Sequence, residues 1–338
     1  MAKKIAAFGE VMMRLQVPGF DLLSQASTLS YSFSGSGVNI SSALTRFGHT
    51  GYLVTTLPAN SVGDAAVSYL RKLGITQSFV VRGGNYVGMY FLENGFGARP
   101  SRVTYSNRQD SSFNTAPDGT YDFAEIAKQV DVVHFCGITL AMNDSVRHHM
   151  KCFAQAVKEN GGTVVFDCNY RTAHWGEDGY AKAKPFYEDM LQLADIVMMN
   201  ENDALFILRM ETDKENRQEQ LMELIPAVAR KYNISVIAGT HRSINGDNTH
   251  SLQGFIFKDQ VFTFSRTLTF SVYDRIGAGD AYASGIVHGE LERFPAARTV
   301  EFAAAAAMLA HTVAGDTPMS SESEILRAMS DSIGDVER

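Results

Sequence analysis

Cysteine is scarce in this chain: Cys136, Cys152 and Cys168 are the three residues of this type among 338. Their number is odd and their spacing does not match that of zinc ligands, so neither a disulfide framework nor a zinc site is expected. Free thiols are typical of a reducing compartment. The N-terminus, Met-Ala-Lys-Lys, leads directly into a strand-like run without the apolar stretch of a signal peptide. We therefore expect a cytoplasmic protein.

Long apolar runs and clusters of positive charge are also missing. The apolar run at residues 302–310 has about half the length that a membrane-spanning helix needs. The net charge is −7, and the Lys and Arg residues are scattered along the chain. These features disfavour nucleic acid and anionic membranes as partners, so any phosphate site must be built locally. Apolar residues make up 45% of the chain, which is enough for a sizeable core.

Short apolar, β-branched runs recur between segments that have the 3.6-residue spacing of amphipathic helices, such as residues 221–232. This alternation predicts an α/β fold with a mostly parallel central sheet and helices on both faces. Ligands of such sheets bind at the carboxyl ends of the strands, and polar clusters follow several of these runs. The expected strands are residues 5–8, 52–57, 130–135, 163–166, 196–199 and 235–238.

Two regions, about residues 11–34 and 86–108, interrupt the alternation with strand-like runs that have no helices between them. Residues 87–92 show the period of two that is typical of strands. We expect a small antiparallel sheet that acts as a lid and excludes water from a site beneath it, within a single α/β domain of residues 1–338. The exposed edges of such a sheet favour a homo-oligomer, a dimer or larger.

The most informative motif is Asp-Arg-Ile-Gly-Ala-Gly-Asp-Ala at residues 274–281, where a β-rich segment gives way to a helical pattern. Gly277 and Gly279 permit a tight turn, and the free N–H groups of the following helix would bind a phosphate. A carboxylate does not help phosphate binding, so Asp280 is predicted to take a proton from a hydroxyl group that attacks the phosphate. The alternative is an ordinary turn with Asp280 as the N-cap.

A second glycine turn, Ser-Gly-Ser-Gly-Val-Asn at residues 34–39, precedes an apolar-periodic helix that ends at Gly48. Gly35 and Gly37 would let a polar substrate lie against the backbone. Asn39 offers a donor and an acceptor to substrate hydroxyl groups. The alternative is a helix start in which Asn39 has no role in binding.

Polar side chains follow two further expected strands. Asp-Cys-Asn-Tyr-Arg at residues 167–171 ends in Arg171, whose guanidinium suits a phosphate or the carboxylate of a sugar acid. Alternatively, Asp167 and Arg171 pair with each other. Asn200 and Asp203 offer oxygen ligands to Mg²⁺ or to its water shell, or they cap a helix.

Together, the order and spacing of these motifs resemble the ribokinase-like carbohydrate kinases, also called the PfkB family, over nearly the whole chain. This resemblance implies the three-layer ribokinase-like fold, ATP and Mg²⁺. It assigns the anion hole to Gly277, Ala278 and Gly279, and the catalytic base to Asp280. Gly35, Ser36 and Asn39 match the sugar-binding motif, although Ser34 stands where a first glycine is common. Asn200 and Asp203 match a motif near magnesium, with Asp in place of Glu and contact through water.

The same resemblance implies a nucleotide site. Gly239 and Thr240 are expected near the nucleotide, and the tail at residues 303–316, with Ala307 and His311, is expected to border the adenine. The ribokinase-type threonines before the glycine turn are replaced by Arg275 and Ile276. Arg275 could instead reach the phosphates.

Within the family, the chain resembles the 2-keto-3-deoxygluconate kinases in Phe8-Gly9-Glu10 with Arg14, and in residues 167–171 ahead of Trp175. This implies that Tyr90, Arg108, Asn169 and Arg171 contact the substrate. Arginines suit a sugar acid, because a neutral hexose has no carboxylate to bind them. The expected reaction is phosphorylation of a primary hydroxyl group of 2-keto-3-deoxygluconate or a close sugar acid.

Two alternatives remain open at this point. The chain could be a kinase of a neutral sugar such as fructose, or a sugar-sensing protein of the same fold without turnover. An intact glycine turn with Asp280 disfavours the sensor, because binding alone needs no base. A dinucleotide-dependent oxidoreductase is disfavoured because no Gly-x-Gly-x-x-Gly follows the first strand.

Overall fold

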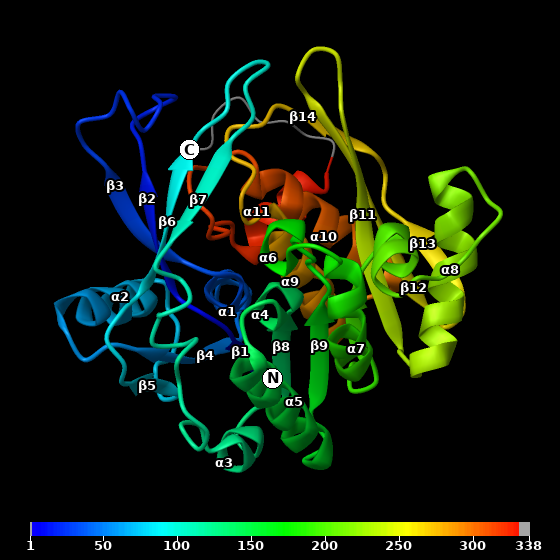
Figure 1. The fold of residues 1–338 in the computed structure, drawn as a ribbon. Coiled ribbons are helices and arrows are strands. Elements are labelled where there is room, and N and C mark those ends of the chain that lie inside the picture. The colour runs from blue at the N-terminus through cyan, green and yellow to red at the C-terminus, as the bar shows by residue number, and fades with distance from the viewer. Residues whose placement is uncertain (1, 331–338) are drawn as a thin grey trace.

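A computed structural model describes residues 2–330, in which strands and helices alternate along most of the chain (Figure 1). The strands are β1 (Lys4–Phe8), β2 (Met12–Gln16), β3 (Ser30–Ser34), β4 (Thr50–Leu57), β5 (Val80–Arg82), β6 (Gly88–Glu93), β7 (Arg102–Ser106), β8 (Val132–Cys136), β9 (Thr163–Asp167), β10 (Ile196–Met198), β11 (Val236–Ile244), β12 (His250–Lys258), β13 (Val261–Phe264) and β14 (Leu268–Phe270). The helices are α1 (Ser36–Arg46), α2 (Ser61–Lys72), α3 (Phe123–Ala127), α4 (Gly137–Leu140), α5 (Asp144–Glu159), α6 (Thr172–Trp175), α7 (Gly179–Leu191), the π-helical segment η1 (Asp203–Ile207), α8 (Arg217–Tyr232), α9 (Ala278–Leu291), α10 (Ala296–Ala310) and α11 (Glu322–Ala328).

The central sheet confirms the predicted fold class. Within residues 2–330 it has ten strands in the order β13-β12-β11-β10-β9-β8-β1-β4-β5, with β14 also paired to β12. The pairs from β11 to β5 are parallel, and β12 pairs antiparallel with β11, β13 and β14. The predicted strand at 235–238 extends further than expected, to Ile244, because it continues as one arm of the hairpin with β12.

The core is divided between the two faces of this sheet, as expected for three layers. One cluster joins Phe135 of β8 to Phe153 of α5 and Tyr187 of α7, and a second joins Ile40 of α1 to Ile286 of α9 and Phe302 of α10. Helices therefore cover both faces of the sheet, and the carboxyl ends of the parallel strands remain open for a site. No helix within residues 2–330 combines the length and the apolar composition that crossing a bilayer requires.

A second, smaller sheet stands beside the first (Figure 1). In the described part of the chain it has four strands in the order β3-β2-β6-β7. The outer pairs are antiparallel, as predicted, but the central pair β2–β6 is parallel. The predicted small antiparallel sheet is therefore confirmed, with one parallel pair at its centre that was not expected. The physical reason is that β2 and β6 belong to two separate excursions from the central sheet and leave it in the same direction.

Candidate functional site

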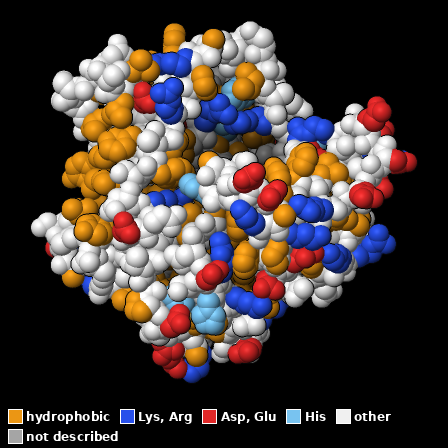
Figure 2. Space-filling view, in the orientation of Figure 1, with side chains coloured by type: hydrophobic (Ala, Val, Ile, Leu, Met, Phe, Trp, Pro, Cys, Tyr) orange, Lys and Arg blue, Asp and Glu red, His pale blue; other side chains and the backbone are white. Residues whose placement is uncertain are grey.

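The predicted site residues line a cleft at the carboxyl ends of the central strands. A cavity of about 780 Å³ adjoins one of about 370 Å³, and the residues that line both are Asp167, Asn169, Arg171, Asn200, Thr240, Gly279 and Tyr282. Figure 2 shows a hollow on this side of the molecule with Lys and Arg side chains beside it. The predicted residues that line one or both cavities are Gly35, Ser36, Asn39, Tyr90, Arg108, Asn169, Arg171, Asn200, Asp203, Gly239, Thr240, Arg275, Gly277, Ala278, Gly279, Asp280, Ala307 and His311.

The glycine turn before α9 is held tightly on both sides. Gly277 has φ 83°, and a Cβ atom there would lie 1.7 Å from the backbone oxygen of Asp316. The Oδ1 atom of Asp274 accepts hydrogen bonds from the N–H groups of Arg275 at 2.7 Å and Ile276 at 3.2 Å. Only glycine fits this position, because it lacks a Cβ and tolerates positive φ.

The start of α9 does not match the ordinary-turn alternative, in which Asp280 is the N-cap. Gly277 is the N-cap, and Asp280 lies in the first turn. The first intrahelical bond in this region runs from the N–H of Ala281 to the carbonyl oxygen of Gly277, at 2.9 Å. The three preceding N–H groups, of Ala278, Gly279 and Asp280, are therefore left for a ligand at the positive end of the helix dipole.

Asp280 is buried and lies where the starts of α1 and α9 meet. Its Oδ1 atom accepts a hydrogen bond from Ser36 Oγ at 2.6 Å, and its Oδ2 atom accepts one from Asn39 Nδ2 at 2.7 Å. Burial raises the pKa of Asp280, and the hydrogen bonds from Asn39 and Ser36 oppose that rise. The carboxylate is thus oriented and made a better proton acceptor than a solvated one.

The glycine turn before α1 has a packing reason as well. A Cβ atom on Gly35, which has φ 156°, would lie 2.3 Å from the backbone oxygen of Glu10. This close approach brings Ser36 and Asn39 to Asp280, so their donors face the carboxylate instead of open cavity. Among the described residues, Asn39 Oδ1 is buried without a hydrogen-bond partner. That atom remains available to accept a bond from a ligand hydroxyl group.

Three carboxylates crowd the boundary between the two cavities. Burial, with the nearby charges of Asp280 and Asp203, raises the pKa of Asp167 to about 7, and Arg171 opposes this. Burial and the charge of Glu201 raise the pKa of Asp203 to about 6, against the hydrogen bond from the Asn200 N–H at 2.9 Å. Such a concentration of negative charge suits a divalent cation. The predicted pairing alternative, Asp167 with Arg171, is not among the ion pairs found within residues 2–330.

Arg108 projects into the large cavity from the loop after β7. Its Nε donates to Glu10 Oε2 at 2.7 Å, and its Nη1 bonds His174 Nε2 at 3.0 Å. Burial, with the charges of Arg108 and Arg171, lowers the pKa of His174 to about 4, so this ring is neutral and accepts the bond. The guanidinium also lies 5.0 Å from the centre of the Tyr105 ring. Arg108 is thus held in one position by three neighbours.

Arg171 and Asn169 follow β9 on the other side of the cavity. The side chain of Arg171 is exposed, and its Nη1 donates to the backbone oxygen of Tyr170 at 3.4 Å. Asn169 has φ 30°, and its Nδ2 contacts Cys136 Sγ at 3.1 Å. Arg171 therefore keeps most of its donors for a ligand.

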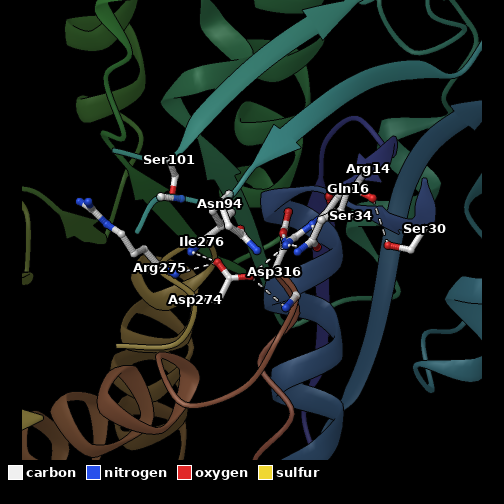
Figure 3. A network of polar contacts seen from close by, with 12 residues as sticks. Arg14, Gln16, Ser30, Ser34, Asn94, Ser101, Asp274, Arg275, Ile276 and Asp316 are labelled. Atoms are coloured by element: carbon white, nitrogen blue, oxygen red, sulfur yellow. Dashed lines mark hydrogen bonds and ion pairs between the residues drawn. The ribbon is translucent and has the colours of Figure 1, made fainter. Parts of the chain in front are cut away.

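The residues predicted to bind a nucleotide lie at the far end of the large cavity. His311 is buried at the end of α10, where its Nδ1 bonds the backbone oxygen of Ala307 at 2.7 Å. Its Nε2 has no hydrogen-bond partner among the described residues, and burial lowers its pKa. Arg275 is exposed and points away from Asp274 (Figure 3), and both Arg275 and Arg242 line the large cavity.

Several interactions around the cleft were not predicted from the sequence. Glu201 is fully buried between Arg217, which donates to it at 2.6 Å, and His241, at 2.8 Å. It anchors the turn that presents Asn200 and Asp203. Arg14 and Asp316 form a buried ion pair behind the glycine turn. Arg14 is a charged residue in the largely apolar strand β2, which is a signal in the sequence, whereas Asp316 lies in a loop and has no such signal.

The arrangement provides the parts that phosphoryl transfer needs. Free N–H groups and a helix dipole face one cavity, a buried carboxylate lies next to them, and guanidinium groups surround the opening. The clustered carboxylates at Asp167 and Asp203 fit a magnesium ion, since burial without a cation raises their pKa values.

Comparison with known proteins agrees with this geometry. The family model described as pfkB family carbohydrate kinase matches residues 2–323. A 2-dehydro-3-deoxygalactonokinase from Haloferax volcanii is 25% identical over 330 residues, which cover 97% of each chain. A 2-dehydro-3-deoxygluconokinase from Thermoproteus tenax is 28% identical over 334 residues, covering 96% of this chain and 94% of that one.

The fold has close counterparts among solved structures. A 2-dehydro-3-deoxygluconokinase from Thermotoga maritima superposes with a TM-score of 0.92 at 32% sequence identity. The alignment covers 97% of this chain and 98% of that protein.

Proposed function

The chain belongs to the pfkB family of carbohydrate kinases, and from this premise we propose that it transfers the γ-phosphoryl group of ATP to a primary hydroxyl group of a 2-keto-3-deoxy sugar acid. 2-Keto-3-deoxygluconate is the first candidate. The galactonate epimer is the second, since relatives carry the names of both kinases. The residues described below are proposed to act in the same way on both epimers.

Asp280 is the proposed general base. Its carboxylate would accept the proton of the attacking hydroxyl group, and Ser36 and Asn39 would hold it in the orientation for this step. The N–H groups of Ala278, Gly279 and Asp280 would stabilise the charge that develops on the transferred group. Because the turn is already rigid, little reorganisation accompanies the reaction.

Asn200 and Asp203 are the residues proposed to contact Mg²⁺ through water. Mg²⁺ held there would neutralise the phosphate charge of the nucleotide. Glu201 keeps this turn in place through Arg217 and His241. Gly239, Thr240, Arg275, Ala307 and His311 are the proposed nucleotide contacts, and the unpartnered His311 Nε2 supports a polar ligand at that end.

The observation that carries the sugar-acid assignment is the pair of guanidinium groups at the large cavity. Arg108 is fixed by Glu10, His174 and Tyr105, and Arg171 has donors to spare. Two cations in a substrate cavity favour a carboxylate, which they can bind with two parallel hydrogen bonds. Gly35, Tyr90 and Asn169 are proposed to complete the substrate site.

Replacing Arg171 with Gln tests this assignment. The variant should raise KM for the 2-keto-3-deoxy sugar acid by roughly 10-fold or more, because a charge-assisted bidentate contact is lost, and should leave KM for ATP nearly unchanged. The exposed Lys182→Gln variant, on α7, is a control that removes a positive charge outside the cleft. An unchanged KM for the acid in the Arg171 variant would favour a neutral sugar as substrate.

We also propose a cytoplasmic homo-oligomer. The three free cysteines support a reducing compartment. Hydrophobic side chains gather over β2 and β3 (Figure 2), and Tyr31 of β3 is 63% exposed. An apolar surface next to an exposed sheet edge supports assembly through the small sheet, which light scattering on the purified protein would measure.

A further inference from the structure

The guanidinium of Arg14 lies between two carboxylates that come from distant parts of the chain. Arg14 is on β2 of the small sheet and is 1% exposed. Its Nη2 donates to Asp274 Oδ2 at 2.9 Å, and its Nη1 donates to Asp316 Oδ1 (Figure 3). Asp274 precedes the glycine turn, and Asp316 follows α10. A strand of the small sheet is thereby bound to two loops of the larger body.

Both carboxylates belong to the structure that holds the glycine turn. Asp274 accepts the N–H groups of the two residues before Gly277 through Oδ1, and that of Gly315 through Oδ2 at 3.1 Å. The backbone oxygen of Asp316 lies where a side chain of Gly277 would begin. Without a cation between them, two buried carboxylates would repel each other and move apart. The turn would move with them.

The other contacts of this group lead back to the small sheet. Gln16 Oε1 accepts hydrogen bonds from Arg14 Nε at 3.2 Å and Nη2 at 2.6 Å. The hydroxyl of Tyr90, on β6, donates to Asp316 Oδ2 and accepts from Ser34 Oγ at 2.9 Å. Residues of β2, β3 and β6 therefore share one hydrogen-bond network with the two aspartates.

Arg14 itself does not line the cavity that contains Asp280. It borders a separate cavity of about 210 Å³, together with Ser32, Tyr69, Gly315 and Asp316. Any effect of Arg14 on the reaction must then pass through Asp274 and Asp316. The separate cavity also gives a small cation a route to these two carboxylates.

We propose that Arg14 is a positioning residue, which fixes the phosphate-binding turn at Gly277 to Asp280 through Asp274 and Asp316 and couples that turn to the small sheet. The inference rests on the proposed function of the turn. It adds a requirement beyond the binding residues. The charges of Asp274 and Asp316, which hold the turn, must be neutralised by Arg14 if the turn is to bind the transferred group in the correct position.

The test compares Arg14→Ala and Arg14→Lys with Arg102→Ala. Arg102 is a matched control because it also lies on the small sheet but pairs with Glu93 of the same sheet, at 3.6 Å. We expect Arg14→Ala to lose roughly 10²-fold in kcat, since a displaced turn misaligns the reacting groups, with much smaller changes in KM for ATP and sugar acid. Arg102→Ala should keep the wild-type kcat.

Chemical rescue separates positioning from simple stabilisation. Millimolar guanidinium chloride should restore part of the kcat of Arg14→Ala at a temperature well below its unfolding transition, and an equal concentration of sodium chloride should not. Arg14→Lys, which keeps the charge but loses the second contact, should have an intermediate kcat and serves if the alanine variant does not fold.

Two results would overturn the inference: a wild-type kcat in a folded Arg14 variant, or a loss of kcat in Arg14→Lys that follows its loss of thermal stability and disappears on cooling. Both require an active wild-type enzyme. If the wild-type protein phosphorylates no sugar, the proposed function fails first, and the two failures are thus distinguished.

Discussion

At the scale of single residues, Asp280 is the group on which the proposed chemistry depends. Asp280→Asn should reduce kcat by roughly 10²-fold or more, because an amide cannot accept the proton of the attacking hydroxyl group. KM for ATP and the thermal unfolding temperature should change little, since Asn39 Nδ2 can still donate to the amide oxygen while Ser36 Oγ accepts from the amide nitrogen. Steady-state kinetics and calorimetry measure these quantities. Asp144→Asn is the matched control, because Asp144 also lies in a first helical turn but is 92% exposed.

The raised pKa of Asp167 predicts how the stability of the protein depends on pH. Its pKa is raised to about 7 in the folded protein, so the unfolded chain binds fewer protons between the two pKa values. The stabilising contribution of the protonated group is therefore complete at low pH and is lost as the pH rises through about 7. Asp167→Asn should raise the unfolding temperature at about pH 8 and have a smaller effect at about pH 5, as differential scanning fluorimetry would measure.

Magnesium should stabilise the ionised form of Asp167, whereas burial without a cation favours the protonated form. A divalent cation favours the ionised form, so MgCl₂ should stabilise the wild-type protein more at about pH 8 than at about pH 5. This difference should shrink in Asp167→Asn and persist in Asp144→Asn. Equal stabilisation by magnesium at both pH values would contradict a cation site next to the carboxylates of Asp167 and Asp203.

The sequence identified the residues of the cleft better than the residues that support them. Asp280 and Arg171 stand in motifs whose chemistry is local, so spacing and residue type were informative, whereas Arg108 was expected only from the resemblance to the family. Arg14 and Asp316 are 302 positions apart, and neither residue carries a local sign of its partner. The same is true of Glu10, whose pairing with Arg108 spans 98 positions. Long-range pairs of this kind require the fold before they can be recognised.

At the scale of elements, the turn before α9 depends on glycine at one position. Gly277→Ala should lower both the unfolding temperature and kcat, because positive φ costs about 1–2 kcal/mol for other residues and the new Cβ would strike Asp316. Gly48→Ala isolates the first effect: Gly48 has φ 89°, and no atom of the described residues lies within 4 Å of its added Cβ. This control should lose only the backbone cost and keep its kcat. If the two variants lose equal stability, the contact with Asp316 does not contribute to the destabilisation by Gly277→Ala.

The elements themselves were largely predictable. The short apolar runs became the buried parallel strands, since strands covered on both faces must be apolar throughout. The end of β11 was placed less well, because the arm of a hairpin has a weak local pattern. The parallel pairing of β2 with β6 depends on how two excursions meet in space, which hydrophobic periodicity does not encode.

At the scale of the whole molecule, the loops and helices that follow the central strands carry the acidic and anion-binding groups, and the small sheet carries Tyr90 and leads into Arg108. The cleft between them is closed on one side by the network of Arg14 and is open beside Arg171 and Arg275. A charged sugar and a nucleotide would therefore enter a cavity with positive charge at its opening and negative charge at its base. This separation favours an anionic acceptor together with a magnesium-bound donor.

The most direct test of the sugar-acid assignment is ADP release by the wild-type protein with Mg-ATP and a panel of acceptors: 2-keto-3-deoxygluconate, its galactonate epimer, gluconate, fructose and ribose. We predict that kcat/KM for one or both 2-keto-3-deoxy acids exceeds that for fructose and ribose by roughly 10²-fold or more, because only an acid engages Arg108 and Arg171. Preferred turnover of fructose or ribose would contradict the sugar-acid assignment while leaving the role of Asp280 intact.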